Sequence, residues 1–290
     1  MIIIKVQGGL GNQLLQYSIG QVIARNLKKD VAYDLSFFDE ENKYTKRPYL
    51  LDKFVVDVRV ATREEIEKAK LPYGIISKYY SLCTRVLNKY LFKKYYIGYD
   101  KDFMARVTKS KSLYLEGFWQ GYKYYEKNLE ELDTLITLKD MSSIEKFKQE
   151  FNFSTKNSVS VHIRRGDFTK KNAGTKVVPK EYYEKAVPFL EKKVTNPTYY
   201  IFSDDIEWVK QEMRGLFKDV VYVSSSSLKD YEEFMFMKEC KHAILSNSTF
   251  CWFSTLLTNT KEKVVVYPNN WENVYLNKDK HICPPEWQGL

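Results

Sequence analysis

The pattern of hydrophobic and polar positions begins with a short apolar run, "MIIIKV", that is followed by a glycine-rich turn at residues 8–11. After the turn, apolar residues recur three and four positions apart as far as Leu27, which is the spacing of an amphipathic helix. A second apolar run, "VAYDLS" at residues 31–36, follows at once. The chain is therefore predicted to begin with a strand, a helix and a second strand.

The pattern is looser between Phe38 and Lys139. Residues 77–96 are aromatic and basic with helical spacing, and residues 112–118, "SLYLEGF", predict a strand. A polar, helix-capable stretch at residues 140–157 separates this half from the next. We expect a domain junction there.

The second half alternates five β-rich apolar runs with four helical ones, which is typical of a parallel sheet covered on both faces. The predicted strands are residues 159–165, 198–205, 219–225, 242–248 and 263–269, and the predicted helices are residues 180–194, 206–216, 228–240 and 249–259. The fold predicted for the whole chain is α/β, with two facing Rossmann-like domains and a cleft between them. We assign residues 1–150 to the first domain and 151–290 to the second, with the C-terminal tail packing back on the first.

Composition narrows the class of protein further. The formal net charge of +9 favours anionic partners such as nucleotides, nucleic acid or an acidic membrane surface. The cysteines form no C-x-x-C pair and are too few for a disulfide framework, which favours a reducing cytosol; they are Cys83, Cys240, Cys251 and Cys283. The N-terminal apolar run is far shorter than the roughly 20 residues of a spanning helix. We therefore expect a cytoplasmic protein.

Polar residues gather where the predicted second-half strands end. Arg164, Arg165 and Asp167 follow the first of these strands, and Asp204 and Asp205 follow the second. In a doubly wound sheet ligands bind outside the carboxyl ends of the strands, and two guanidinium groups can clamp a dianion such as a phosphate. The alternative is that the arginines pair with neighbouring acids as a structural network.

Three further groups near these strand ends have candidate roles. Four residues of "SNST" lie at the start of a predicted helix: Ser246, Asn247, Ser248 and Thr249. Their side chains can cap this helix, which explains their types equally well, and the free N–H groups of the helix favour a phosphate. Asp204 and Asp205 have four candidate roles, which are magnesium binding, proton transfer, holding the arginines and, most of all for Asp205, capping a helix. Strand alternation places His162 on the same face as Arg164.

The first-half turn "GGLGNQ" lies between a strand and a helix, as a dinucleotide-binding turn does. The G-x-G-x-x-G pattern fails because Leu14 takes the place of the third glycine, so a dinucleotide site has weak support. Gly9 and Gly11 still allow close approach of a ligand to the backbone, and Asn12 and Gln13 are predicted to face it. Asp34 stands where a ribose-binding acid would.

Apart from the candidate role of Asp204 and Asp205 in magnesium binding, no metal site is predicted. The single D-x-D sequence, Asp100 to Asp102, lies in a lysine-rich context without a preceding strand, and the three histidines are too scattered for zinc.

Five motifs in linked order resemble those of the bacterial α-1,2-fucosyltransferases, glycosyltransferase family 11. They are "GGLGNQLLQYS", "VHIRRGDF", "IFSDDIEWVK", "KECKHAILSNSTFCW" and "HICPPEW", and they run from near the N-terminus almost to the C-terminus. The resemblance implies a GT-B-like fold, GDP-fucose as donor and transfer of fucose with inversion to the 2-hydroxyl of a terminal galactose. It also implies that no metal is essential, that the second half holds GDP and that the first half holds much of the acceptor.

The resemblance also carries roles for particular residues. It implies that one of the adjacent arginines contacts the β-phosphate, that Asn12 lies near the sugar and phosphate, and that Glu233 accepts the guanine N–H groups. Asp167 is our candidate for the general base. The residues expected to bind GDP-fucose are His162, Gly9, Gly11, Gln13, Asp204, Asp205, Glu233, Ser246, Asn247, Ser248 and Thr249.

The chain departs from the family pattern at two places. Most members have aspartate at the position of Glu233, and "CWFSTLL" stands where "SWWGAWL" is more common. Both changes lie near the expected donor site.

Two other functions stay open. One is a transferase of the same fold with a different GDP-sugar, linkage or acceptor; the other is a basic module that binds nucleic acid or an anionic membrane through residues 78–106, where tyrosines alternate with lysines. For the enzyme, the expected acceptor is a galactose-terminated oligosaccharide or a lipid-linked glycan at the inner membrane surface. Trp119, Tyr122 and Trp271 are candidates for stacking on sugars or for core packing.

Overall fold

The computed structural model describes most of the chain as two compact units. Unit 1 comprises residues 1–52 and 56–128, and unit 2 comprises residues 53–55 and 129–290. The backbone alone is described for residues 95–97, Arg106, Asp167 and Ser225. The described residues are 1–39, 47–70, 95–97, 103–110, 112–169, 176–225, 227–260, 262–269 and 282–290.

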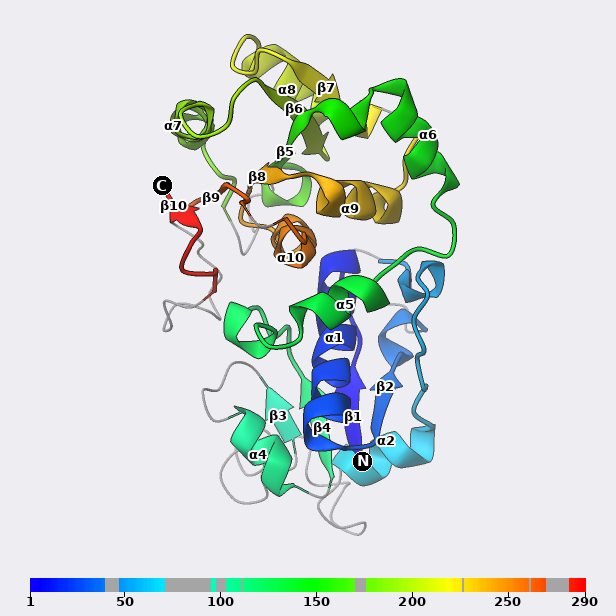
Figure 1. Ribbon diagram of the computed structural model, residues 1–290. Helices are drawn as coiled ribbons and strands as arrows, with labels where there is room; N and C mark the ends of the chain where they lie inside the picture. The colour runs from blue at the N-terminus through cyan, green and yellow to red at the C-terminus, as the bar shows by residue number, and fades with distance from the viewer. Residues whose placement is uncertain are drawn as a thin grey trace. The chain divides into compact units, whose positions relative to one another are not determined.

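Unit 1 is built on a parallel sheet with the strand order β2-β1-β4-β3 (Figure 1). The apolar N-terminal run forms the central strand β1, which pairs with β2 from Ile2 opposite Val31 and with β4 from Ile2 opposite Leu113. The predicted strand–helix–strand opening is thus confirmed. The strands are β1 Ile2–Lys5, β2 Val31–Asp34, β3 Tyr95–Ile97 and β4 Leu113–Glu116, and the helices are α1 Leu10–Leu27, α2 Arg63–Lys70 and α4 Phe103–Lys109, with short 3₁₀ turns η1 Ser36–Phe38, η2 Leu51–Lys53 (continuing into unit 2) and η5 Tyr122–Tyr124.

Unit 2 contains a parallel sheet with the strand order β10-β9-β8-β5-β6-β7. Its strands are β5 Asn157–Ile163, β6 Pro197–Ser203, β7 Val220–Tyr222, β8 His242–Ile244, β9 Val265–Tyr267 and β10 Gln288–Gly289. Its helices are α5 Leu129–Leu135, α6 Ser142–Glu150, α7 Lys180–Glu191, α8 Ile206–Glu212, α9 Asp230–Glu239 and α10 Thr249–Leu257, with short turns η6 Phe153–Thr155, η7 Gly166–Thr169 and η8 Val223–Ser225. The five strands and four helices predicted for the second half are confirmed.

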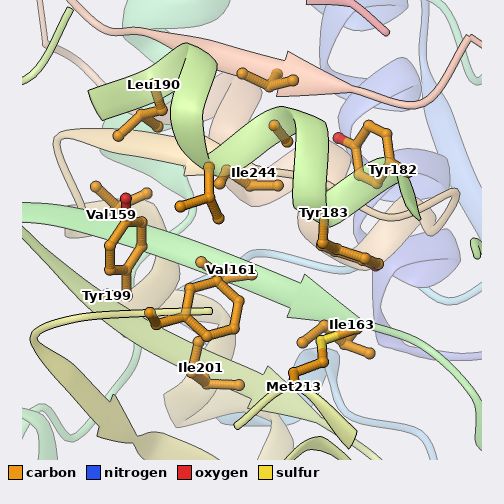
Figure 2. Packing of buried hydrophobic residues seen from close by; sticks show 14 of the residues in the cluster. Val159, Val161, Ile163, Tyr182, Tyr183, Leu190, Tyr199, Ile201, Met213 and Ile244 are labelled. Atoms are coloured by element: carbon orange, nitrogen blue, oxygen red, sulfur yellow. The ribbon is translucent and has the colours of Figure 1, made fainter. Parts of the chain in front are cut away.

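Alternate residues of β5 point to opposite faces of the unit 2 sheet. Val159, Val161 and Ile163 are buried against side chains of α7 and α8, as Figure 2 shows for Val161, Ile163 and Tyr183. His162 lies on the other face, where Phe250 of α10 contacts it and where α9 and α10 pack against each other. His162 and Arg164 therefore share the face of α10.

The order of strands reverses at β5. The chain continues from β5 to β6 and β7 on one side and later adds β8, β9 and β10 on the other. The carboxyl ends of β5 and β8 therefore form the switch point of the sheet, where doubly wound folds hold their ligands.

The two units divide at Asn128 and Leu129, earlier in the chain than the predicted junction at residues 140–157. The reason is that α5 packs on α10 and α6 packs on α9, both within unit 2. Lys238 of α9 fixes the end of α5 by donating to the carbonyls of Asp133 and Ile136 at 2.7 and 3.1 Å. The polar segment at 140–157 is therefore part of unit 2.

Two further elements differ from the prediction. Tyr95 and Tyr96 begin β3, although helical spacing was predicted for residues 77–96; residues 71–94 lie outside the described part of the chain. Residues 288–289 of the C-terminal tail, for which no strand was predicted, pair with β9 in unit 2.

Candidate active site

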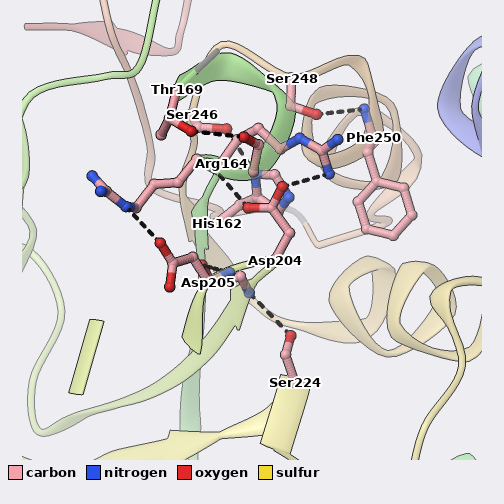
Figure 3. A network of polar contacts seen from close by, with 12 residues as sticks. His162, Arg164, Thr169, Asp204, Asp205, Ser224, Ser246, Ser248 and Phe250 are labelled. Atoms are coloured by element: carbon pink, nitrogen blue, oxygen red, sulfur yellow. Dashed lines mark hydrogen bonds and ion pairs between the residues drawn. The ribbon is translucent and has the colours of Figure 1, made fainter. Parts of the chain in front are cut away.

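The carboxyl ends of β5 and β6 bring together the two arginines and two aspartates that the sequence indicated. The strands are parallel and in register, with Ile163 opposite Ser203, so the residues that follow them lie at one edge of the sheet. Arg164 Nη1 lies 3.1 Å from Asp204 Oδ2, and Arg165 Nε lies 3.1 Å from Asp205 Oδ2. Figure 3 shows these contacts at the strand ends. Both arginines are thus held by acids, as the alternative interpretation had it.

The two arginines are held in different surroundings. The guanidinium carbon of Arg165 lies 3.6 Å from the centre of the Trp208 ring on α8, so this side chain stacks as well as pairs. Arg164 lies over Phe168 at 5.6 Å and acts electrostatically on His162. Arg164 is therefore on the switch-point side, and Arg165 is fixed against α8.

Asp204 organises the turn that follows β5. Besides pairing with Arg164, it accepts a hydrogen bond from the backbone N–H of Arg165 at 2.8 Å. A Cβ atom at Gly166 would collide with Asp204 Oδ2, so only glycine leaves room for this carboxylate. The predicted function of Asp204 as a holder of the arginine is the one that the contacts support.

Asp205 occupies the N-cap position of α8, but its side chain makes no capping hydrogen bond. Its carboxylate turns to Arg165 instead, and its own N–H donates to Ser203 Oγ at 3.1 Å. The prediction that Asp205 caps the helix is therefore wrong for the side chain, because a charged partner outweighs a neutral N–H.

His162 and Ser246 join the ends of β5 and β8. His162 Nδ1 lies 2.7 Å from Ser246 Oγ, and the imidazole is buried. Burial, with a smaller effect from Arg164, lowers the pKa of His162 to about 3. The ring is therefore neutral at physiological pH and is a poor general base.

The segment from Ser246 to Thr249 leads from β8 into α10. Ser248 is the N-cap of α10, and its hydroxyl accepts from the N–H of Phe250 at 3.4 Å, which confirms the predicted capping. The Asn247 amide donates to the carbonyl of Lys176 at 2.8 Å. Ser246 and the first turn of α10, which begins at Thr249, thus face the switch point.

Glu233 lies on the first turns of α9, half-buried beside the end of β7. Burial raises the pKa of Glu233 to about 7, although a hydrogen bond with Ser224 opposes the shift. Ser224 in turn accepts from the N–H of Ser203 at 3.0 Å, so Glu233 is tied to the end of β6. A carboxylate with this pKa can change its charge when a ligand arrives.

In unit 1 the glycine turn connects β1 to α1. Gly8 has a φ of +82°, the left-handed region that favours glycine. Gly9, the N-cap of α1, has a φ of −75°, and a Cβ there would meet no atom within 4 Å. Gly11 and Asn12 continue into the first turn of α1, with Gly11 buried and Asn12 half-buried. The backbone conformation of Gly9 therefore does not require glycine. The space that a side chain at this position would occupy is open.

Gln13 was predicted to face a ligand, but it is fully buried. Its Nε2 donates to the carbonyls of Gly8 and Pro48 at 2.9 and 2.8 Å, and its Oε1 accepts from the N–H of Leu50 at 2.9 Å. All its hydrogen-bonding groups serve the chain. The hydrogen bonds of Gln13 therefore connect residues 48–50 to the glycine turn.

Asp34 also serves the structure instead of a ribose. It is fully buried and accepts from Tyr114 Oη at 2.6 Å and from the N–H of Ser36 at 3.0 Å. Burial raises the pKa of Asp34, but these hydrogen bonds and the charge of Lys70 outweigh it, so the pKa lies below its usual value. The ionised carboxylate anchors the turn after β2.

Sequence reasoning missed Trp208 and Gly166, which position the arginines. A tryptophan inside a helical pattern carries no signal that it will stack on a guanidinium. The pair Arg-Gly next to an aspartate-bearing strand end could have indicated the close approach at Gly166.

Several other candidates have no described place in a site. Trp119 is buried and packs against Phe103 at 6.0 Å, so it serves the core. Tyr122 begins η5 and is half-buried. Trp271, the D-x-D sequence at 100–102, most of the basic segment 78–106 and the side chain of Asp167 lie outside the described residues.

Metal-binding clusters and membrane-spanning helices are both absent from the described residues. Among them no group of three or more His, Cys, Asp or Glu side chains is placed to hold a metal ion. No helix in this part of the chain is long and apolar enough to cross a bilayer.

Comparison with known proteins gives the family. The model of glycosyl transferase family 11 matches residues 1–290. The chain belongs to glycosyl transferase family 11. This transferase is 27% identical to the alpha-1,2-colitosyltransferase of Escherichia coli over 99% of its own chain and 98% of the relative. It is 26% identical to the O-antigen biosynthesis glycosyltransferase WbnK of Escherichia coli, over 92% and 93% of the two chains.

More distant relatives match this chain over part of its sequence or in fold alone. The galactoside 2-alpha-L-fucosyltransferase Sec1 of Mus musculus is 26% identical over 46% of the family 11 chain and 38% of its own. The crystal structure of NodZ alpha-1,6-fucosyltransferase with GDP superposes with a TM-score of 0.52 at 14% identity, covering 88% and 91% of the two chains. A mutant of Arabidopsis thaliana FUT1 with GDP gives a TM-score of 0.52 at 10% identity, covering 93% and 71%. The fold is the GT-B-like α/β fold of these enzymes, as predicted, and the protein is a glycosyltransferase.

Proposed function

We propose that this family 11 transferase moves L-fucose from GDP-fucose to the 2-hydroxyl of a terminal galactose, with inversion at the anomeric carbon. The observation that carries the proposal is the meeting of His162, Arg164 and Ser246 at the switch point of unit 2. Full-length similarity to a bacterial alpha-1,2-transferase and partial similarity to galactoside fucosyltransferases support the linkage and the sugar.

Arg164 is the arginine that we assign to the diphosphate. It lies on the face of β5 that looks toward α10, whereas Arg165 is stacked on Trp208 and paired with Asp205. A guanidinium carries several N–H donors in a planar fork, so Arg164 can keep Asp204 and also bind a phosphate oxygen. The N-terminus of α10 adds a positive end to the same region.

The chemical step breaks the bond between the fucose anomeric carbon and the β-phosphate oxygen. The acceptor oxygen attacks that carbon from the opposite face, the bonding pair leaves with GDP, and the hydroxyl proton passes to a base. Charge on the leaving GDP is greatest in the transition state, where Arg164 stabilises it most. The sugar becomes oxocarbenium-like, as in glycoside hydrolysis.

The base is still a proposal. Asp167 follows the arginines in sequence and is our candidate. His162 is unsuited because its pKa of about 3 makes it a weak base at neutral pH. Asp204 and Asp205 are engaged with the arginines.

Glu233 is the proposed ligand of the guanine ring. The ionised carboxylate of Glu233 can accept hydrogen bonds from the two N–H groups on the edge of guanine. A hydrogen bond with Ser224 connects Glu233 to the strand ends.

Docking on an anionic membrane through the basic residues of segment 78–106 stays a prediction.

The test is an assay of GDP-fucose with lactose, followed by linkage analysis of the product. We expect consumption of GDP-fucose and a fucosyl α-1,2-galactose linkage. Use of another GDP-sugar, with GDP-fucose neither transferred nor hydrolysed, would overturn the donor assignment.

A second candidate differs in the donated sugar. The full-length similarity to an alpha-1,2-colitosyltransferase favours it. A colitosyl donor offered in competition with GDP-fucose distinguishes the two, since the true donor has the higher kcat/KM.

A further inference from the structure

We propose that Phe37, Phe38 and Tyr49 of unit 1 form a stacking surface for the acceptor sugar. The inference rests on the proposed function, because it names the part of unit 1 that holds the acceptor. None of the three residues belongs to the motifs from which the sequence predicted a site.

The three rings form one group. The Phe37 and Phe38 ring centres are 5.3 Å apart, and those of Phe38 and Tyr49 are 5.4 Å apart, both with edge-to-face geometry. All three side chains are half-buried. Part of each residue therefore stays exposed, although core packing favours full burial of aromatic residues.

The group lies at the carboxyl edge of the unit 1 sheet. Phe37 and Phe38 belong to η1, which starts two residues after the last residue of β2. Loops at this edge of a parallel sheet are where ligands bind in doubly wound folds. Tyr49 belongs to residues 48–50, which Gln13 joins to the glycine turn after β1.

Hydrogen bonds hold both parts of the group in place. Asp34 fixes the start of η1 by accepting from the N–H of Ser36 at 3.0 Å, and Tyr114 holds Asp34 at 2.6 Å. Gln13 fixes the segment of Tyr49 through the carbonyl of Pro48 and the N–H of Leu50, at 2.8 and 2.9 Å. Rings fixed before binding lose little conformational freedom when a ligand arrives.

Open space lies beside the glycine turn, which the segment of Tyr49 adjoins. Gln13 Nε2 bonds the carbonyls of both Gly8 and Pro48, so the residue before Tyr49 approaches the glycine turn closely. A Cβ at the adjacent Gly9 would meet no atom within 4 Å. A ligand on the rings can therefore extend over the turn.

The chemistry of the occupant follows from that of the surface. A galactose ring carries adjacent C–H groups on one face, which is apolar, and hydroxyls around its edge. The apolar face can lie on an aromatic ring and leave water, while the hydroxyls find polar partners at the rim. A terminal galactose of the acceptor fits this surface.

The experiment measures lactose binding and lactose KM in matched variants. Phe38→Leu keeps the apolar volume but removes the flat ring, and Phe38→Tyr keeps the ring. Phe189→Leu, a half-buried phenylalanine on α7 in unit 2, is the control. Saturation-transfer NMR reports direct contact between aromatic protons and the galactose ring without any need for turnover.

We expect Phe38→Leu to raise the lactose KM roughly two- to tenfold and to weaken the NMR signal, since an aromatic contact contributes about 0.5–1.5 kcal/mol beyond its area. Phe38→Tyr and Phe189→Leu should behave like wild type, and GDP affinity should not change in any variant. Unchanged lactose binding in a folded Phe38→Leu protein, or an equal loss of GDP affinity, would overturn the proposal. Ring-dependent lactose binding without GDP-fucose turnover would leave this proposal standing and refute the proposed donor.

Discussion

His162 Nδ1 lies 2.7 Å from Ser246 Oγ, and this contact joins the ends of β5 and β8 at the point where the strand order of unit 2 reverses. The imidazole is buried beside Arg164, and burial, with a smaller effect from that charge, keeps it neutral. The contact fixes the relative position of the two strand ends that are proposed to bind the diphosphate.

Ser246→Ala should therefore destabilise the protein. The substitution leaves Nδ1 of a buried histidine without its partner, which costs about 1–3 kcal/mol. Urea unfolding at pH 7.5 measures the loss, and Thr134→Ala, at an exposed hydroxyl on α5, is the control. An unchanged unfolding midpoint would show that the contact contributes nothing.

The same histidine predicts acid sensitivity. The pKa of His162 is lowered from 6.5 to about 3 in the folded state, so the unfolded chain binds a proton that the folded chain does not. Its contribution to stability is complete above pH 6.5 and is lost as the pH falls toward 3. His162→Gln should flatten the fall in unfolding free energy between pH 6.5 and 5; an unaltered slope would contradict the assignment.

Glu233 predicts that GDP affinity rises with pH. Burial raises the pKa of Glu233 to about 7, and only the ionised carboxylate accepts the guanine N–H groups, so affinity should increase from pH 6 to pH 8. Titration calorimetry measures it, and Glu233→Gln should bind GDP weakly without that pH dependence. Equal pH dependence in both proteins would remove Glu233 from the guanine site.

Stability should move in the opposite direction. The folded state keeps a proton on Glu233 that the unfolded state has lost between pH 4.5 and about 7, so this residue lowers the unfolding free energy as pH rises through that window. Glu233→Gln should abolish that part of the pH dependence.

Gly8 and Gly9 form a matched pair. Gly8→Ala forces a side chain into a φ of +82° and within 3.0 Å of Asn12 Nδ2, which should cost about 1–2 kcal/mol in stability. Gly9→Ala meets neither obstacle, so its melting temperature should equal that of wild type while donor affinity falls. Wild-type GDP-fucose affinity in Gly9→Ala would show that the donor does not approach this position.

Much of the fold could be predicted because buried parallel strands are continuous apolar runs, as in β1 and β6. By contrast β10 contains only Gln288 and Gly289, and backbone hydrogen bonds such as Leu290 N–H to the carbonyl of Tyr267 hold the tail there. Such a strand has no apolar pattern to recognise.

The candidate site was predictable in its strand ends but not in how each side chain is used. Gln13 and Asp34 both stood at plausible ligand positions, yet each is buried by partners distant in sequence, such as Leu50 and Tyr114. Asp205 had a local N–H to cap and turned to Arg165 instead. Local patterns cannot decide between a near neutral partner and a distant charged one.

Arg164 gives the most direct test of the central claim, that this side chain binds the donor diphosphate. GDP is titrated into wild type, Arg164→Ala and Arg165→Ala, with the melting temperature of each protein measured alongside. We predict that Arg164→Ala melts near wild type and loses GDP binding and at least about a hundredfold in kcat, whereas Arg165→Ala loses stability with its Trp208 and Asp205 contacts but keeps GDP binding when folded. Wild-type GDP affinity in a folded Arg164→Ala protein would contradict the account.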